Sequence, residues 1–541
     1  MRVPAGGPLI RSASAPCPRP PPAARPAVTS TDLAVAPTLG PGTGLADPIT
    51  GNRVIATVLA LVVFAIDMAS PSGMTADPIR AVSVAVSMVH YHSLSLNRFQ
   101  PLPDPGYAIT VVNGHIYPLF PWAVSLFAVP WVILEDVGHK LGLTEGSVAM
   151  VRSGHDWGLQ LVSMATVVAA TTVVVYFTSL RVLRLQPQAR RRRWAVAVAL
   201  AFALATPAWS TASRAMWQHG PSMLCIAVGL LCALRAQSGQ RGWMGMGAAL
   251  AASYAMRPTD SIVIIVMAVW VVVSQRRHLV AVVAGAVPPL VVLVGVNLAV
   301  YHQPLSPYYT GGQSFDITGT MAVALAGNLV SPARGLLIFC PLVVLSVAGV
   351  VVRWRAGELT AFWKALAVIP VLHWVVISAF KHWWGGDSYG PRFFTDVMPV
   401  LVVLALPAVE VLARWLAPAA ESAVPLEATG TEQGADTQPG VGSAVRPTPP
   451  RLRWRRALVA LTLVALVWSL GVEAQGAILR SAWCWNNEPV DVDVHPSNLW
   501  NWSDPQFARG IRTVIWGPDR RSEITRDGVD LIGCPTEPVR P

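Results

Sequence analysis

Long apolar runs recur along this chain, and each is close to the length of a membrane-spanning helix. A helix needs about 20 apolar residues to cross a bilayer, where lipid offers no partner to a free backbone amide. The runs are 54–68, 156–180, 194–212, 221–236, 242–256, 259–275, 279–300, 334–352, 362–380, 393–415 and 457–473. With 53% hydrophobic and 13% charged residues, the chain lacks the polar surface of a soluble globule. We therefore predict an all-α polytopic membrane protein with about 11 transmembrane helices.

Basic residues lie between these runs and indicate the orientation, because cytoplasmic loops are enriched in Lys and Arg. The basic groups are Arg2, Arg11, Arg19, Arg25 and Arg53; Arg181, Arg184 and Arg190 to Arg193; Arg235 and Arg241; Arg276 and Arg277; Arg353, Arg355 and Lys364; and those between Arg451 and Arg456. We expect a plasma-membrane protein with a cytoplasmic N-terminus and an extracytoplasmic C-terminus. The loops expected outside are 69–155, 213–220, 257–259, 301–333, 381–392 and the tail from 475. Orientation, and not nucleic-acid binding, then explains the net charge of +11.

The polar segments complete the predicted organisation. The first 50 residues are rich in Pro, Ala and Arg and lack the apolar core of a secretory signal. Cys484 and Cys534 share one polar segment, where a disulfide would stabilise a small fold in an oxidising exterior. The expected parts are a disordered cytoplasmic leader 1–50, a transmembrane core 51–415 with a first outer loop 69–155, a disordered cytoplasmic linker 416–456, a last transmembrane helix 457–474, and a small extracytoplasmic tail 475–541.

One further apolar segment, 117–135, does not fit a simple crossing. Counting it as a span would place Arg190 to Arg193 outside. We predict instead a re-entrant or membrane-surface helix that is broken by Pro121 and Pro130.

The first outer loop begins with an acid and a base three residues apart, Asp77 and Arg80. One helical turn places both on the same face. Asp77 could be an ordinary first-turn charge at a helix start. Its position directly after the first span favours a general base beside a membrane-embedded cavity, with a nearby cation binding a phosphate.

Further along the same loop, the sequence NGHIYPLFPW places His115, Tyr117 and Trp122 next to prolines. These rings could form a rigid wall for a sugar or lipid head group, although interfacial anchoring explains Trp122 better.

A short outer loop, RAMWQHGPSM, contains Arg214, Trp217 and His219. A snorkelling Arg and an interfacial Trp explain the first two without a function. His219 is left as a candidate for substrate binding.

The densest polar cluster lies in AFKHWWGGDSYGPRFFTD, whose ionisable groups are costly at a membrane boundary unless they are used. Lys381 and Arg392 could clamp a phosphate, and ordinary lipid head-group contact is the alternative. The candidate substrate-binding residues here are Trp383, Trp384, Asp387 and Tyr389. The loop 301–334, which is longer than a simple connection needs, could act as a lid over the same cavity.

These features together resemble the GT-C superfamily of membrane glycosyltransferases, which use polyprenyl-phosphate sugars and include protein O-mannosyltransferases and the lipid A aminoarabinose transferase. The resemblance rests on Asp77 and Arg80, on NGHIYPLFPW, on His219 where relatives often have an acid, and on WWGGDSYGPRFF. It covers roughly residues 54–415 as architecture. The segment WCWNNEPVDVDVHPSNLWNWSDPQ resembles the ending of actinobacterial membrane proteins of this class.

The resemblance implies an inverting transfer to a cell-envelope acceptor, which could be a glycan, a lipid or a protein. Asp77 would deprotonate the acceptor, and Arg80, Lys381 and Arg392 would bind the donor phosphate. Because His219 replaces a possible metal-binding acid, a metal-independent reaction without a cofactor is expected. The sequence also has no nucleotide-binding glycine loop, CxxC pair or HExxH motif.

Two other functions fit the same sequence. A transporter or flippase for a lipid or polar solute would carry ionisable or helix-breaking residues near mid-membrane, whereas the polar residues here crowd toward one face. A non-catalytic protein that binds a lipid-linked sugar would need no second acid in the first outer loop.

Overall fold

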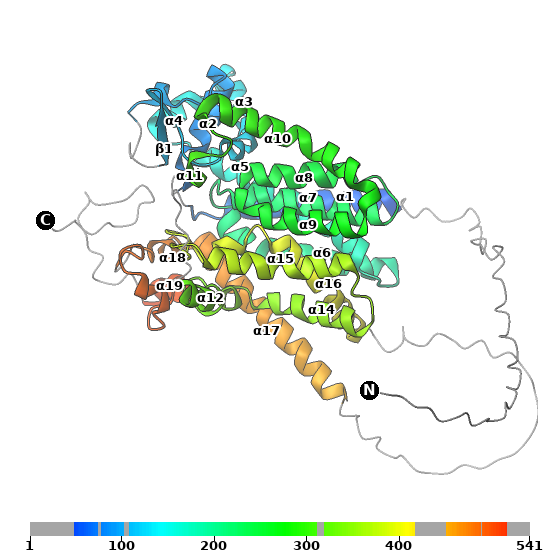
Figure 1. The fold of residues 1–541 in the computed structure, drawn as a ribbon. Coiled ribbons are helices and arrows are strands. Elements are labelled where there is room, and N and C mark those ends of the chain that lie inside the picture. The colour runs from blue at the N-terminus through cyan, green and yellow to red at the C-terminus, as the bar shows by residue number, and fades with distance from the viewer. Residues whose placement is uncertain are drawn as a thin grey trace, which may run out of the picture. The chain divides into compact units, whose positions relative to one another are not determined.

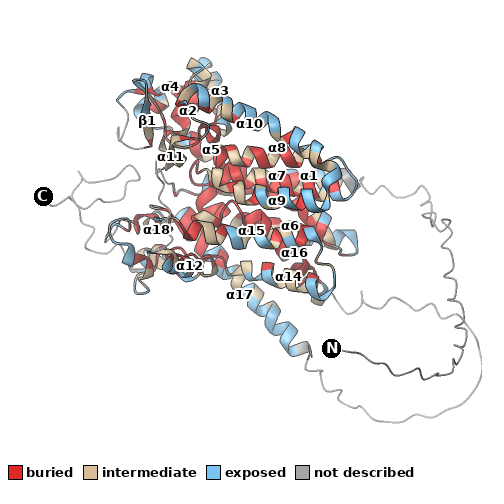
Figure 2. Ribbon diagram, viewed as in Figure 1, coloured by how far each residue is buried: buried red, intermediate tan, exposed pale blue. Residues whose placement is uncertain are grey.

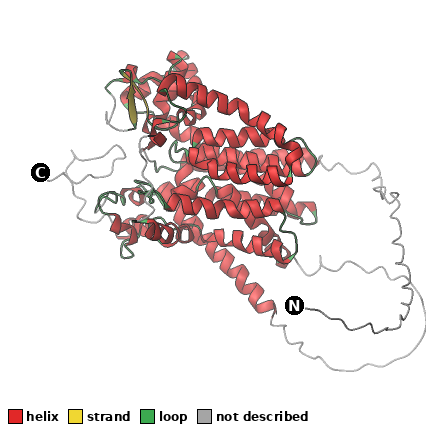
Figure 3. Cartoon of the chain, in the orientation of Figure 1, coloured by secondary structure: helices red, strands yellow, loops and turns green. Residues whose placement is uncertain are grey.

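The protein was analysed as a computed structural model, which describes residues 48–73, 77–101, 108–310, 319–416, 451–487 and 490–516. The description that follows concerns the unit Ile49–Pro541. The predicted leader and linker lie almost entirely outside the described residues. Helices dominate, and the described strands form one small hairpin (Figure 3).

Seven of the described helices are long and apolar enough to cross a membrane. They are α1 (Pro48–Ala69), α5 (Trp157–Val182), α7 (His219–Gln237), α10 (Leu279–Tyr301), α15 (Ala361–Ser378), α16 (Met398–Trp415) and α17 (Arg451–Ile478). Apolar side chains on their outer faces are exposed. Examples are Val280 of α10, which is 81% exposed, and Val467 of α17, which is 69% exposed. Figure 2 shows the buried residues on the inner faces of the bundle. An apolar outer surface over apolar helices is that of an integral membrane protein.

Shorter helices pack among the long ones. They are α6 (Gln188–Leu204), α8 (Trp243–Met256), α9 (Ser261–Ser274) and α14 (Val344–Arg355). Two of the predicted runs are interrupted: 194–212 passes from α6 into a π-helical turn, η4 (Ala208–Ala212), and 334–352 begins with α13 (Leu336–Phe339) and η7 (Pro341–Val343). Because these helices are shorter than a full crossing, the count of about 11 transmembrane helices remains a prediction.

Glycines let neighbouring helices approach closely. A Cβ atom on Gly247 of α8 would lie 1.9 Å from the carbonyl oxygen of Val282 in α10, and a Cβ on Gly349 of α14 would lie 1.9 Å from that of Leu404 in α16. Small residues at helix crossings are the usual means of packing in lipid, where burial of apolar surface does not drive association. Both crossings therefore require glycine.

The polar connections gather at two opposite ends of the bundle. At one end lie α2 (Ala81–Tyr91), α3 (Val129–Lys140), α4 (Ser147–Ser153), α18 (Ser481–Cys484) and α19 (Gln506–Trp516) (Figure 1). The 26 residues of α5, about 39 Å of helix, lead to the other end. There Arg184 Nη1 lies 3.0 Å from Glu358 Oε1. The loops that we expect outside therefore share one end, which we call the outer end, and the Arg-rich connections share the other.

The segment 117–135 does not form one spanning helix. It contains the end of the antiparallel hairpin β1 (Ile109–Val112) and β2 (His115–Pro118), then η3 (Trp122–Phe127), and then the start of α3. Pro121 precedes η3, and Pro130 lies in the first turn of α3, where a missing N–H costs nothing. Pro130 thus starts a helix and does not break one.

The tail continues α17 with α18, η10 (Pro496–Trp500) and α19. Buried Trp485 and Leu499 pack there against Trp383 and Trp384. Cys484 is disulfide-bonded. Its predicted partner, Cys534, lies outside the described residues, so this pairing stays a prediction.

Candidate active site

The predicted base and the predicted phosphate-binding arginine meet, although 315 residues separate them in sequence. Asp77 begins the short helix η1 (Asp77–Arg80) after α1, and Arg392 begins η8 (Arg392–Phe394) before α16. Arg392 Nη1 donates to Asp77 Oδ2 at 3.2 Å. The Asp77 side chain is 25% exposed and that of Arg392 is 7% exposed, so the pair lies at the edge between protein and solvent.

Arg392 is held mainly by aromatic rings. Its Cζ lies 4.0 Å from the centre of the Trp217 ring and 5.3 Å from that of Phe393. Gly385, with a φ of +76°, passes close behind it, and a Cβ there would lie 3.2 Å from Arg392 Nε. Arg392 Nε is buried without a hydrogen-bond partner among the described residues. The guanidinium is therefore fixed in place by the rings and by its ion pair with Asp77.

A hollow adjoins this ion pair, with about 380 Å³ of empty space when the adjoining open solvent is included. Asp77, Arg80, Trp122, Trp217 and Gln218 are among the residues that line it. Trp122 is buried, and its indole N–H donates to Asn297 Oδ1 at 2.9 Å. The prediction that Trp122 anchors the protein at the membrane interface was therefore wrong. The ring packs inside the protein, and its N–H donor is used by Asn297.

The chain segment that leads to Asp77 is anchored by Arg214. Arg214 donates to the carbonyl oxygens of Asp67 and Ser70, each at 2.6 Å, and its Nη2 lies 3.6 Å from Asp67 Oδ1. Burial lowers the pKa of Arg214 to about 10, an effect that the Asp67 charge opposes. The predicted snorkelling of Arg214 and interfacial place of Trp217 were wrong, because both side chains are buried at the site.

A second buried polar cluster lies beside Arg392. Arg257, in the connection between α8 and α9, forms an ion pair with Asp396. His219 Nδ1 lies 4.0 Å from Asp396 Oδ2, and His373 Nε2 lies 3.6 Å from Asp396 Oδ1. The cluster reaches the Asp77–Arg392 pair through Phe393, whose ring centre is 5.4 Å from the Arg257 Cζ. His219 thus belongs to this buried cluster and is not among the residues that line the hollow described above.

Two tyrosines of the predicted lid approach the same place. Tyr308 and Tyr309 lie in α11 (Pro307–Thr310), and residues 311–318 of that loop lie outside the described part. The Tyr309 hydroxyl donates to Gln218 Oε1 at 2.9 Å, and the Tyr308 ring lies 4.6 Å from that of Phe120, which lines the hollow. Burial, helped by the charge of Asp77, raises the pKa of Tyr308 to about 12. Tyr308 is therefore a neutral hydroxyl donor near the carboxylate.

Other candidate residues occupy supporting positions. Trp383 and Trp384 are buried against the tail, and the Trp384 indole donates to Asp493 Oδ1 at 2.6 Å. The Tyr389 hydroxyl donates to the carbonyl oxygen of Val472 in α17 at 2.7 Å, and its ring is fully buried. These three side chains hold the loop 381–392, which contains Gly385, Gly386 and Gly390 and is called the glycine-rich loop below, against α17 and the tail.

The remaining candidates lie further out. Lys381 is exposed, and Asp387 is half-buried, with its pKa raised to about 6 by burial and by the charges of Asp493 and Asp491. In the hairpin, His115 Nδ1 lies 3.1 Å from Asn97 Nδ2, and the Tyr117 ring lies 6.0 Å from that of Tyr301. The described residues that line the hollow do not include Lys381, Asp387, His115 or Tyr117.

Sequence reasoning missed several groups at this site. Arg257 carried no local signal, because its partner Asp396 is 139 residues away. Trp217 and Gln218 lie in the loop RAMWQHGPSM, where the sequence pattern indicated an interfacial place for Trp217 and substrate binding only for His219. In the described part of the chain, no group of three or more His, Cys, Asp or Glu side chains is arranged to hold a metal ion.

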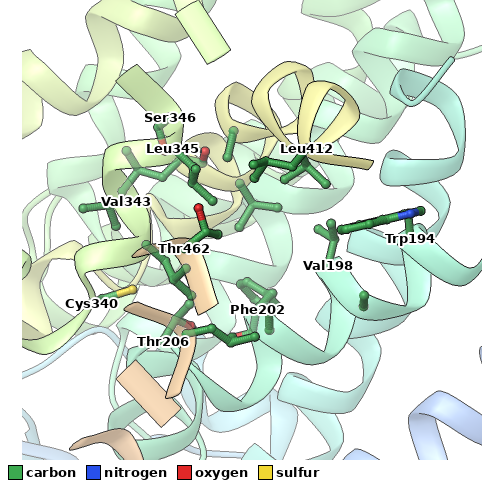
Figure 4. Close-up of a pocket in the computed structure, with 18 of the residues that line it drawn as sticks. Trp194, Val198, Phe202, Thr206, Cys340, Val343, Leu345, Ser346, Leu412 and Thr462 are labelled. Carbon is green, nitrogen blue, oxygen red and sulfur yellow. Dashed lines mark hydrogen bonds between the residues drawn. The ribbon is translucent and has the colours of Figure 1, made fainter. Parts of the chain in front are cut away.

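A separate apolar groove lies within the bundle (Figure 4). It encloses about 990 Å³, including open space, between α6, α14, α16 and α17. Phe202, Leu345, Leu412 and Thr462 are among its lining residues. It shares no lining residue with the hollow beside Asp77.

Comparison with known proteins gives a limited result. No family model matches the chain, and no curated protein matches it. The chain is similar to the crystal structure of ArnT from Cupriavidus metallidurans bound to undecaprenyl phosphate, with a TM-score of 0.42, 16% identity, and coverage of 86% of this chain and 76% of that one. For ArnT from the same organism in the apo state, the TM-score is 0.39 at 16% identity, with coverage of 87% and 76%.

Proposed function

We propose that this protein is a membrane glycosyltransferase that moves a sugar from a polyprenyl-phosphate donor to a cell-envelope acceptor at the outer face of the plasma membrane. The observation that carries the proposal is the ion pair of Asp77 and Arg392 beside a hollow at the outer end of the bundle. A carboxylate next to a fixed guanidinium is the arrangement that a hydroxyl acceptor and a phosphate leaving group require.

The proposed reaction uses the two charges in one displacement. The acceptor hydroxyl binds near Asp77, which accepts its proton as the oxygen attacks the anomeric carbon of the sugar. The bond between that carbon and the phosphate oxygen breaks on the opposite face, so the configuration inverts. The electron pair of this bond leaves with the polyprenyl phosphate, whose growing negative charge Arg392 stabilises.

Other side chains have roles that follow from their places. Arg80 lines the same hollow as Asp77 and adds positive charge for the donor phosphate. Lys381, exposed at the outer end, is proposed as an outlying phosphate contact. We assign His115, Tyr117 and Asp387 to the outer walls of the substrate site.

The buried candidates act by shaping the site. Trp383, Trp384 and Tyr389 fix the glycine-rich loop. His219 packs against the Phe393 ring at 5.8 Å between centres, next to Arg392. The polyprenyl-phosphate donor itself is inferred from the resemblance of WWGGDSYGPRFF and of the Asp77–Arg80 pair to GT-C enzymes.

The test is transfer of a radiolabelled sugar from polyprenyl phosphate by the purified full chain in nanodiscs. Asp77→Asn keeps the shape of the side chain and removes the base, so we expect the rate to fall by roughly 100-fold or more. Glu145→Gln is the matched control, since Glu145 is a half-exposed acid of the same outer loop. It should leave the rate unchanged.

Equal rates for the Asp77→Asn variant and the natural chain would reject Asp77 as the base. Movement of a lipid or solute across vesicles without a covalent change would instead favour the transporter.

A further inference from the structure

The last described helix, α19, has two unlike faces. Ile511, Val514 and Ile515 are apolar and 46%, 68% and 61% exposed. Arg509 and Arg512 belong to the other face, where Asp504 pairs with both: Arg509 Nη1 lies 2.5 Å from Asp504 Oδ2, and Arg512 Nη1 lies 3.0 Å from Asp504 Oδ1. A short helix with an open apolar stripe and a basic face is typical of helices that lie in a membrane interface.

α19 is fastened to the outer end of α17. The side chain of Gln475 donates to the carbonyl oxygen of Phe507 at 2.7 Å and accepts from the N–H of Ile511 at 3.0 Å. Gly510 packs at the same place, where an added Cβ would lie 2.8 Å from Leu479 Cδ1. The helix is therefore fixed at the level where α17 leaves the bundle.

The apolar stripe of α19 continues the lipid-facing surface of α17. The Phe507 ring lies 5.5 Å from that of Trp468, which is 44% exposed on α17, and Val464 and Val467 extend this exposed surface toward the other end. Trp502 is also exposed and lies 6.5 Å from Phe507. Aromatic rings at one level between an apolar band and basic residues mark the membrane–water boundary.

From this geometry we infer that α19 is an interfacial helix whose apolar face is covered by phospholipid of the outer leaflet. Ile511, Val514 and Ile515 enter the boundary of the acyl chains. Arg509 and Arg512, with the exposed Arg480 at the end of α17, face the lipid phosphates.

The seating of α19 also reaches the candidate active site, a step that rests on the proposed function. Gln506, the first residue of α19, accepts from Arg334 Nη1 at 2.6 Å and from the Gly390 N–H at 3.1 Å, and donates to the Ser388 carbonyl oxygen at 2.9 Å. Hydrogen bonds to Gln506 thus help to position the glycine-rich loop that precedes Arg392. Under this inference, the helix that contains Gln506, α19, is itself positioned by the membrane. Gln506 is a positioning residue.

Collision accessibility of nitroxide labels tests the seating on the full chain in nanodiscs of phosphatidylethanolamine and phosphatidylglycerol. A ketone-bearing amino acid at position 514 carries the label and leaves the native cysteines untouched. Oxygen concentrates in hydrocarbon, whereas a neutral nickel chelate stays in water. We expect the label at 514 to collide with oxygen and not with the nickel chelate. A control label at position 512 should collide with the nickel chelate and not with oxygen.

Two results would overturn the seating. Collision of the label at 514 with nickel would place the stripe in water. Protection from both reagents would show that protein, including other residues of this chain, covers it.

The link to the active site has its own readout. Val514→Asp with Ile515→Asp changes only exposed side chains, and we expect the donor KM to rise while kcat is retained. Arg152→Asp, at an exposed site on α4 that has no proposed contact with donor or lipid, makes the same change in charge and is the control. If the label at 514 contacts lipid but the double variant has an unchanged donor KM, α19 lies in the membrane interface without affecting the active site. If no transfer is detected with any donor, the proposed function fails and the label experiment still decides the seating.

Discussion

Two arginines at the outer end of this protein, Arg334 and Arg392, are both buried and are used in opposite ways. Arg334 makes five side-chain hydrogen bonds, to the carbonyl oxygens of Ala333, Trp384 and Gly386 and to the side chains of Asn486 and Gln506. Arg392 has a single carboxylate partner, Asp77, aromatic rings beside it, and an Nε without a partner in the described structure.

The difference separates a structural arginine from one to which the proposed function assigns phosphate binding. Every N–H of Arg334 is used, so no further anion can be bound without breaking the connection between the tail and the glycine-rich loop. Arg392 pairs with Asp77, which lines the hollow, so under the proposed function a phosphate beside that carboxylate would gain a charge-assisted hydrogen bond from the guanidinium. Burial alone therefore does not distinguish the two arginines, whereas the number of their hydrogen-bond partners among the described residues does.

Replacing Arg334 should have the largest effect on stability. Arg334→Met leaves a cluster of buried oxygens without donors, and removal of one partner from such a network costs about 3–5 kcal/mol. We expect a much lower midpoint in thermal unfolding of the detergent-solubilised chain, together with loss of transfer. Arg480→Met, at an exposed site on the same tail, is the control. An unchanged midpoint for Arg334→Met would remove the distinction between the two arginines.

Arg392→Lys should act on binding and not on folding. Lysine keeps the charge and loses both the fork and the stacking on Trp217, so we expect affinity for polyprenyl phosphate to fall by about 10-fold to 100-fold. Fluorescence titration of the purified chain measures it, and the thermal midpoint should stay within a few degrees of the natural value. A large fall of the midpoint with unchanged affinity would make Arg392 structural.

A smaller effect concerns Asp387, which lies in the loop that Arg334 holds. Because its pKa is raised to about 6 by burial and by Asp493 and Asp491, the folded chain binds this proton more tightly than the unfolded chain does. The contribution of Asp387 to stability is thus greatest below pH 4 and is lost as the pH rises from about 4 to about 6.

Asp387→Asn removes this titration. We expect the variant to be more stable near neutral pH by about 1 kcal/mol and to lose part of the pH dependence between 4 and 6. Thermal midpoints of both chains across that range measure the difference. The same slope in both chains would assign the pH dependence to other groups.

The parts of this site that depend on long-range contacts could not be predicted from the sequence. Apolar length and the spacing of basic residues predicted the long helices and the gathering of the outer loops at one end, since both are local patterns. Asp77 and Arg392 stood out because charged residues at a membrane boundary are unusual. Their distance from each other, the stacking of Trp217, and the pair of Arg257 with Asp396 depend on how the helices pack, which no local pattern encodes.

The same limit explains the errors. Trp122, Arg214 and Trp217 have the composition of interfacial residues, and only the fold shows that they turn inward. For the substrate-binding candidates Tyr389, Trp383 and Trp384, the structure adds contacts that the sequence does not show: the Tyr389 hydroxyl bonds to α17, and both tryptophans pack against the tail. Aromatic residues near a membrane boundary have several energetically similar positions, and the neighbouring helices select one of them.

The separation of Asp77 from Arg392 has a consequence during biosynthesis. The ribosome adds Asp77 early in synthesis. It adds Arg392 315 residues later, after most of the helices have been delivered to the membrane. Nascent chains that stall before this point carry half of the charge pair. Under the proposed function, a chain that ends before Arg392 would therefore have no transfer activity.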